Sequence, residues 1–308
     1  MFHALGDRRS AGPALCAGTG LSGLLTVVTA QEVEQTAHAA GFGDIAQELA
    51  GLARPALLLQ PGADDGRVGR LGGRPRLPFG MGWPQTRWKT MKPQTLTFVA
   101  EFDLAALDQS VWPGPQAGTL SVFCYVSADA LYVDSGGAAL VLHHPPGAPL
   151  EQSEIPDDLD EELRYDELTV GAVAGTTLPW IGVGPARELI PFGLGDLNDF
   201  DRDERYRRMA IGITGQLDNR APHQLLGWPR FTQEDVNRIW PQLHQEAIEY
   251  GLSSGEVARD DWRLLLQVGS DPQLGTCFGD GGDLFFAIPG SDLAAGRFDR
   301  VQAITDSG

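Results

Sequence analysis

Cysteines and basic residues are scarce in this sequence, and both scarcities narrow the range of functions. The 308 residues include only three cysteines, Cys16, Cys124 and Cys277, which are widely separated and form no C-x-x-C pair. Neither a zinc knuckle nor a disulfide framework is indicated, so we expect a cytoplasmic protein. Lysine and arginine number 23 against 41 aspartates and glutamates, a formal net charge of −18. This charge disfavours nucleic acid and anionic membranes as partners, because phosphate contacts need clustered basic side chains.

Long apolar runs are also absent. No segment approaches the roughly 20 apolar residues of a membrane-spanning helix. Residues 1–28 combine Arg8-Arg9 with a short apolar stretch that glycines interrupt, and a helix start follows instead of a cleavage site. We expect residues 1–28 to be a disordered leader, or the product of a start codon assigned too far upstream. Residues 29–308 are then expected to form a single β-rich domain.

Catalytic and metal-binding motifs occur only in unsuitable contexts. The G-x-S-x-G match at 251–255 follows a helical pattern, whereas a nucleophile elbow needs a preceding strand. The G-x-G-x-x-G match at 18–23 lacks the strand of a dinucleotide site, and the acidic residues at 199–204 lack the glycine of a calcium loop. His143 and His144 are adjacent, so on a strand they point to opposite faces. We therefore predict no cofactor, no metal site and a noncatalytic protein.

The strongest structural pattern lies near the C-terminal end. Leu264–Val268 is an apolar run too short for a helix, and Leu284–Ile288 is a second one. Between them, Gly279-Asp280-Gly281-Gly282-Asp283 permits positive φ and close backbone approach. Asp280 and Asp283 either converge on a ligand or cation, or hydrogen-bond the amides of their own turn. The sequence leaves both interpretations open.

The rest of the chain alternates strands with a few helices. Thr29 and Glu32 form a capping-box pattern before a helix, and a second short helix is expected over 45–52. Residues 61–95 are expected to be a long loop held by Trp83 and Trp88. A charged helix is expected at 196–209, and a further helix is expected to run from 232 to 240 and to restart at Pro241 through 250. Further strands are expected at 56–59, 96–102, 120–125, 130–133, 138–142 and 168–178, with a helical turn and a final strand over 291–304.

A weak internal repeat is visible in this pattern. Gly82-Trp83-Pro84 precedes the strand expected at 96–102, and Gly227-Trp228-Pro229 precedes Leu264–Val268. A Gly-x-Leu strand follows in both cases. The predicted fold is therefore mainly β (α+β), with roll-like antiparallel sheets and peripheral helices, and it allows an internally duplicated architecture.

The same residues carry a family resemblance. Gly72–Pro78, Trp83-Pro84 and Leu96–Glu101 resemble the first half of the YwqG-like family of bacterial proteins of unknown function. His223–Pro229 with Gln233-Glu234-Asp235 is similar to its second half, and Leu265–Gln267, Ser270-Asp271, Gly279–Gly281 and Leu284–Phe286 are similar to its closing part. The resemblance spans roughly residues 50–305 and implies a mainly β, roll-like domain without an established reaction. Some family members lie near toxin and immunity genes, which implies a binding role. Glu101 departs from the family pattern, which usually has glutamine there.

These features lead to a hypothesis for function and to two alternatives. We predict a binding module that recognises a protein or a small ligand through the tryptophan and Gly/Asp loops. The candidate binding residues are Trp83, His223, Trp228, Gln233, Asp280 and Asp283. One alternative is a hydrolase or metal-assisted enzyme that uses Asp280, Asp283 and His223. The other is an immunity protein that neutralises a toxin through the acidic segment 151–167.

Overall fold

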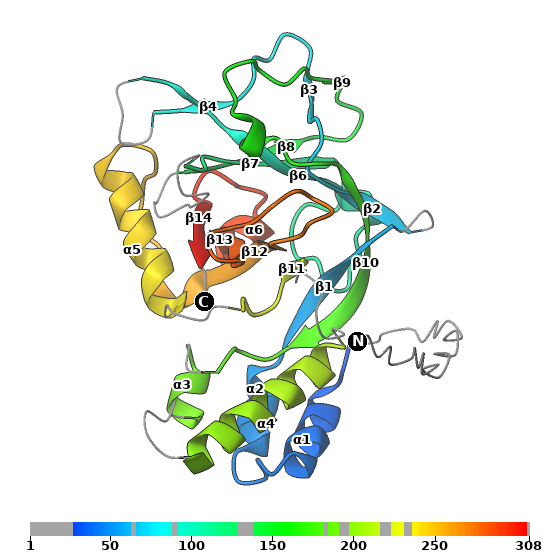
Figure 1. The fold of residues 1–308 in the computed structure, drawn as a ribbon, viewed down its shortest axis with the longest axis vertical. Coiled ribbons are helices and arrows are strands. Elements are labelled where there is room, and N and C mark those ends of the chain that lie inside the picture. The colour runs from blue at the N-terminus through cyan, green and yellow to red at the C-terminus, as the bar shows by residue number, and fades with distance from the viewer. Residues whose placement is uncertain are drawn as a thin grey trace, which may run out of the picture.

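Ten of the strands hydrogen-bond into one antiparallel sheet that is nearly closed (Figure 1). The computed structural model describes residues 27–62, 66–87, 92–127, 138–181, 184–190, 197–215, 223–230 and 236–306. The ten strands are β1 (Arg54–Pro61), β2 (Arg67–Leu71), β6 (Thr97–Asp103), β7 (Thr119–Cys124), β8 (Ala139–His144), β10 (Leu168–Thr177), β11 (Gln224–Leu226), β12 (Trp262–Gly269), β13 (Asp283–Pro289) and β14 (Gln302–Asp306). Their order is β14-β13-β12-β11-β1-β10-β2-β6-β7-β8, and within the described residues this leaves β14 and β8 at the two edges.

The strand order is symmetric about the central pair β1–β10. Reading outward, β11 to β14 follow β1, and β2, β6, β7 and β8 follow β10. The chain therefore consists of two five-strand halves, β1 to β8 and β10 to β14, and the first strand of each half pairs with the second strand of the other. The exchange of first strands binds the halves to each other through main-chain hydrogen bonds.

Local details repeat in the two halves. A break in register interrupts β6 between Phe98 and Ala100, and another interrupts β12 between Leu264 and Leu266. After β2, Gly72 and Gly73 have φ of 61° and 76°; at the end of β11, Leu226 and the following Gly227 have φ of 63° and 76°. Each pair is followed by one residue and then Pro-Arg. The repeat thus aligns Arg74-Pro75 with Trp228-Pro229, which corrects the expected alignment of Gly82-Trp83-Pro84 with Gly227-Trp228-Pro229.

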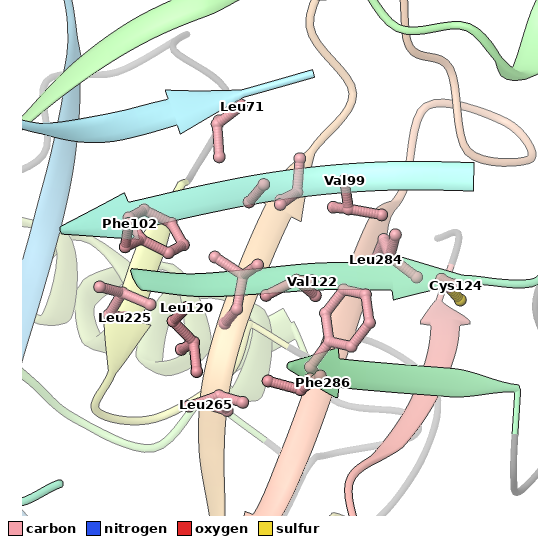
Figure 2. Close-up of a cluster of buried hydrophobic side chains, with 14 of the residues drawn as sticks. Leu71, Val99, Phe102, Leu120, Val122, Cys124, Leu225, Leu265, Leu284 and Phe286 are labelled. Atoms are coloured by element: carbon pink, nitrogen blue, oxygen red, sulfur yellow. The ribbon is translucent and has the colours of Figure 1, made fainter. Parts of the chain in front are cut away.

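The main core lies between the strands of the two halves. Figure 2 shows Leu71, Val99, Phe102, Leu120, Val122 and Cys124 of the first half packed against Leu225, Leu265, Leu284 and Phe286 of the second. All ten side chains are buried. Their positions alternate along the strands as the pleat requires, so a second set of residues faces outward.

Helices cover parts of the outer surface. α1 (Ala30–Ala39), α2 (Ala46–Leu52) and α4 (Leu197–Thr214) pack together around Phe42 and Tyr206, and the Thr29–Glu32 capping box is present. α5 (Val236–Glu249) covers the outer face of the second half through Trp240 and Leu243. The short helices α3 (Ala186–Leu189) and α6 (Gly290–Ala294) complete the set, together with 3₁₀ turns at Leu104–Ala106, Glu161–Leu163 and Arg259–Asp261.

Two expectations for these segments were wrong. The stretch 61–95 contains β2, β3 (Arg76–Pro78), β4 (Gln85–Thr86) and β5 (Gln94–Thr95); β3 pairs with β9 (Leu150–Gln152), and β4 pairs with β5. Pro241 lies inside α5 and does not divide it. Proline removes one N–H but has a helical φ, so a helix whose apolar face is buried can accommodate it. In the described part of the chain, no helix is long and apolar enough to cross a membrane.

Candidate functional site

A groove of about 790 Å³ runs along β8, which is an edge strand of the sheet as far as the chain is described. Residues 139–143 of β8 line it consecutively, and Leu96, Leu252 and Phe298 are among the residues on its other sides. Successive side chains of a strand point to opposite faces of the sheet. Five residues in a row therefore line one space only when the backbone edge of the strand faces it.

The register of β7 and β8 shows which backbone groups face this groove. The Tyr125 N–H donates to the Ala138 carbonyl at 2.8 Å, one step beyond the Cys124–Ala139 pair. Hydrogen-bonded and non-hydrogen-bonded pairs alternate in an antiparallel ladder. The N–H and C=O groups of Ala139, Val141 and His143 consequently point away from β7, toward the groove, as the free side of an edge strand does.

The walls of the groove combine apolar and polar side chains. Leu96, Leu140 and Leu142 lie on the outer face of the sheet, and the ring of Phe298 lies 6.0 Å from that of His143. Arg87 and Asp299 bring one charge of each sign. A site with this lining favours an uncharged, partly apolar ligand that can bond to a strand backbone.

A polar region separate from the groove lies on the outer face of the second half, around two paired glutamines. Gln224 Nε2 donates to the carbonyls of Leu226 at 3.0 Å and Trp228 at 2.9 Å. Its cross-strand partner Gln267 accepts the Arg230 N–H at 3.2 Å and donates to Asp283 Oδ2 at 2.9 Å. Two of the predicted site residues, Trp228 and Asp283, are thus brought into one hydrogen-bonded region.

Asp283 has an unusual protonation equilibrium. Burial raises the pKa of its carboxyl to about 7, against the lowering effects of Arg230 and the Gln267 hydrogen bond, and Asp306 raises it further. Asp306 is the cross-strand partner of Asp283 on β14. Near neutral pH, Asp283 can therefore hold or release a proton.

Trp228 is fixed on several sides. Its indole Nε1 donates to the Leu52 carbonyl at 2.7 Å, its backbone N–H donates to Thr177 Oγ1 at 2.8 Å, and the Arg54 guanidinium stacks on its ring. A cavity of about 20 Å³ lies beside it and is lined also by Trp180. That volume admits about one water molecule.

In the described part of the chain, no hydrogen bond links the His223 side chain to that of Asp280 or Asp283. Its Nε2 lies 3.1 Å from Asp271 Oδ2, and its Nδ1 accepts the Gly269 N–H at 3.2 Å. Burial lowers the pKa of His223, and the Asp271 hydrogen bond opposes this. Asp280 is exposed at its turn. The three groups of the hydrolase alternative therefore lie in different surroundings.

Trp83 belongs to the first half, and Gln233 lies outside the described residues. The Trp83 indole donates to the Leu96 carbonyl at 2.8 Å and packs edge-to-face on Phe123 at 6.0 Å. In the described part of the chain, no hydrogen bond or ring contact joins Trp83 to Trp228, Asp280 or Asp283.

The first half places charged side chains where the second has glutamines. Arg70 and Glu101 are cross-strand partners, as Gln224 and Gln267 are. Glu101 accepts the Arg76 N–H at 3.0 Å, much as Gln267 accepts that of Arg230, and Arg70 donates to the Arg74 carbonyl at 2.6 Å, as Gln224 does to that of Trp228. The departure at Glu101 is explained by its ion pairs with Arg70 at 3.2 Å and Arg76 at 2.8 Å.

The fold and these contacts define a mainly β, internally duplicated protein with peripheral helices. The family model described as domain of unknown function (DUF1963) matches residues 69–307, and the chain belongs to this family. No curated protein matches the chain.

The groove along β8 was not among the predicted sites. A strand was expected at 138–142, and β8 confirms it; the companion strand expected at 130–133 lies outside the described residues. Whether a strand lies at a sheet edge depends on the order of all ten strands. No local pattern in residues 139–144 could have shown it.

Proposed function

We propose that this chain is a noncatalytic binding protein that takes an extended polypeptide segment into the groove along β8. The observation that carries the proposal is the consecutive lining of the groove by residues 139–143 of an edge strand. Such an edge can add a strand from a partner, with main-chain hydrogen bonds giving affinity and side-chain contacts giving specificity.

The geometry supports a polypeptide over a small polar ligand. Outward N–H and C=O groups at Ala139, Val141 and His143 recur at every second residue, which matches the spacing of a strand backbone. The volume of about 790 Å³ falls within the range of pockets that enclose sizeable ligands. Leu96 and Phe298 give apolar contacts for alternate side chains of the bound segment.

Three further proposals concern the family relationship, the location and the partner. They are a YwqG-like relationship within the family, a cytoplasmic location, and a toxin as the bound protein. The acidic segment 151–167 is the part of the surface that would meet a basic toxin. Arg164 donates to the Leu159 carbonyl at 2.6 Å and Asp158 accepts from Thr95 at 2.9 Å, so this segment is fixed to the fold.

A peptide selection followed by one substitution tests the groove. Random ten-residue peptides displayed on phage are selected on the immobilised full chain, and a selected synthetic peptide is titrated by calorimetry. Ala139→Pro removes an outward N–H at the first residue of β8, where proline is tolerated. We expect the Kd to rise about tenfold, the effect of roughly one lost hydrogen bond.

Ala139→Ser is the matched control, because it changes the same side chain and keeps the N–H; its Kd should stay that of the wild type. Hydrogen exchange should slow at Ala139, Val141 and His143 when the peptide is bound. If Ala139→Pro unfolds, a peptide N-methylated at alternate positions tests the same bonds from the ligand side. Unchanged affinity of the proline variant or of the N-methylated peptides, or a bound peptide that is helical by circular dichroism, would overturn the proposal.

A further inference from the structure

The two charged residues that line the β8 groove lie at opposite ends of it. Asp299 is at the end where β8 finishes, because it follows Phe298, whose ring lies 6.0 Å from that of His143, the last residue but one of β8. The two arginines nearest to Asp299 in the sequence both form ion pairs with the buried Asp292, and neither lines the groove. The exposed carboxylate of Asp299 therefore supplies a negative charge at this end.

Arg87 lies at the other end, where β8 begins. It follows β4, whose last residue, Thr86, pairs with Gln94 on β5. Gln94 Nε2 donates to Tyr125 Oη at 3.1 Å, and the Tyr125 N–H donates to the carbonyl of Ala138, the residue before β8. The exposed guanidinium of Arg87 therefore supplies a positive charge at this end.

The two charges are far enough apart to act separately. Residues 139–143 line the groove between them. At about 3.4 Å per residue, four steps along a strand cover roughly 14 Å. The Debye length is about 8 Å at physiological ionic strength, so each charge acts mainly on the nearest part of a bound segment.

The order of the charges favours one direction of an added strand. Antiparallel pairing is slightly more stable per residue than parallel pairing. A segment antiparallel to β8 begins beside His143 and ends beside Ala139. Its first side chains then meet Asp299, and its last ones meet Arg87, so a positive start and a negative end are favoured.

The two charges also lie toward different faces of the sheet. Phe298, which precedes Asp299, belongs to the main core on the inner side. Leu96 lies on the outer side, and its N–H donates at 3.1 Å to the carbonyl of Pro84, directly before β4 and Arg87. Side chains of a strand alternate between faces, so charges an odd number of positions apart reach both sides.

We propose that the groove selects its segment by charge order. The segment is extended, runs antiparallel to β8, and has a lysine or arginine at its start and an aspartate or glutamate five positions later. It has no net charge, in keeping with one charge of each sign in the lining. This proposal rests on the proposed function of the groove and adds the direction and the chemistry of the bound strand.

Two phage libraries test the charge order. One displays six-residue segments that begin with lysine and end with glutamate; the other has the two charges exchanged, and the four central positions are random in both. The libraries are mixed at equal titre and selected on the immobilised full chain. We expect about tenfold enrichment of lysine-first clones, because an exposed ion pair at each end contributes severalfold to affinity.

The most enriched lysine-first sequence is then synthesised with blocked termini in three forms: as selected, with the two charges exchanged, and with glutamine at both ends. The selected form should have a Kd about tenfold lower than the exchanged form, and sodium chloride should reduce this ratio. A nitroxide on the first residue of the selected form should broaden the amide resonance of His143 more than that of Ala139.

Exchanging the charges of the groove should reverse the preference. Arg87→Glu combined with Asp299→Arg keeps the net charge and should bind the exchanged peptide about tenfold more tightly than the selected one. Arg67→Glu combined with Asp44→Arg is the matched control, because both residues are exposed and neither lines the groove. This control should keep the wild-type preference. If the Arg87/Asp299 variant does not fold, the nitroxide and salt measurements on the wild type still decide.

The glutamine-ended peptide separates the two proposals. If it shifts the amide resonances of Ala139, Val141 and His143 but charge order has no effect, the groove binds a strand and the proposed selection is wrong. If none of the three peptides shifts these resonances, the proposed function fails as well. Equal Kd values for the selected and exchanged peptides, or stronger broadening at Ala139 than at His143, would overturn the selection by charge order.

Discussion

Asp283 and Asp306 face each other across neighbouring strands, and their proximity makes one side chain sensitive to pH. In an unfolded chain an aspartate has a pKa near 3.9. In the folded protein the pKa of Asp283 is raised to about 7 by burial, with a further contribution from Asp306. Between these values the folded state holds a proton that the unfolded state releases, so the free energy of unfolding falls as pH rises through this window.

Asp283→Asn should remove this pH dependence. Asparagine keeps an oxygen that can accept from Gln267 Nε2 but cannot ionise. Relative to the wild type, the variant should gain about 2 kcal/mol in free energy of unfolding between pH 5 and pH 8, since each pKa unit corresponds to about 1.4 kcal/mol. Urea unfolding at several pH values measures this difference.

Asp280→Asn is the control for this change, because Asp280 lies exposed three residues earlier in the same loop. Its free energy of unfolding should follow that of the wild type at every pH. Parallel curves for wild type and Asp283→Asn from pH 5 to pH 8 would contradict the assignment.

Among the secondary-structure elements, corresponding strand pairs of the two halves carry different polar side chains at the same position. Between β2 and β6 the cross-strand pair is Arg70–Glu101, an ion pair at 3.2 Å in which both side chains are largely buried. Between β11 and β12 the corresponding pair is Gln224–Gln267, which is neutral. Each pair makes the same two kinds of main-chain hydrogen bond to the segment that follows the second strand of its half.

This correspondence predicts a specific double-variant result. Glu101→Gln should lower the free energy of unfolding by about 3 kcal/mol, because it leaves the buried Arg70 with only the more distant carboxylate of Glu167, at 3.9 Å, as a counter-ion. Adding Arg70→Gln should recover much of that loss, since the first half would then carry the glutamine pair of the second. Urea unfolding of wild type, both single variants and the double variant gives the coupling energy.

The coupling should exceed about 1 kcal/mol in favour of the double variant. Independent, additive losses would show instead that the surroundings of the two pairs differ too much for one to replace the other. Arg76 also forms an ion pair with Glu101, at 2.8 Å. Glu101→Gln removes this ion pair as well, and Arg70→Gln does not restore the stability lost with it.

The sequence was informative about elements that their own residues determine. The capping box at Thr29 and the apolar runs of β6, β7, β12 and β13 predicted structure that the fold confirms. The short strands β3, β4 and β5 were not predicted, because a strand of two or three residues is stable only when it hydrogen-bonds to a partner strand. β3 depends on β9, which lies more than seventy residues further along the chain.

Which of the candidate site residues lie close together could not be predicted from the sequence, for a related reason. Asp283 and Trp228 do lie in one polar region, which Gln224 and Gln267 connect. The β8 groove arises from strand order and from contacts between distant residues. It leaves no motif in the sequence that composition or spacing could detect.

Across the complete sheet, the exchange of first strands makes the folding of each half depend on the other. β1 belongs to the first half but pairs with β10 and β11 of the second, and β10 pairs with β2 of the first. A half produced alone would lose these neighbours and expose two long apolar strand edges. The exchange also accounts for the single core shared by side chains of both halves.

After a cut in the chain between the halves, the two fragments should therefore stay associated in the native fold. The turn at Pro145–Ala148 is a suitable place, because it follows β8 and is largely exposed; a protease site inserted after Gly147 cuts the chain there. The two fragments should elute together in size-exclusion chromatography and keep the far-ultraviolet circular dichroism of the uncut chain. Each fragment expressed alone should lack cooperative unfolding, because its first or second strand has no partner. Two separately folded fragments after the cut would mean that each half forms its own sheet, and the strand order β11-β1-β10-β2 would then not describe the protein in solution.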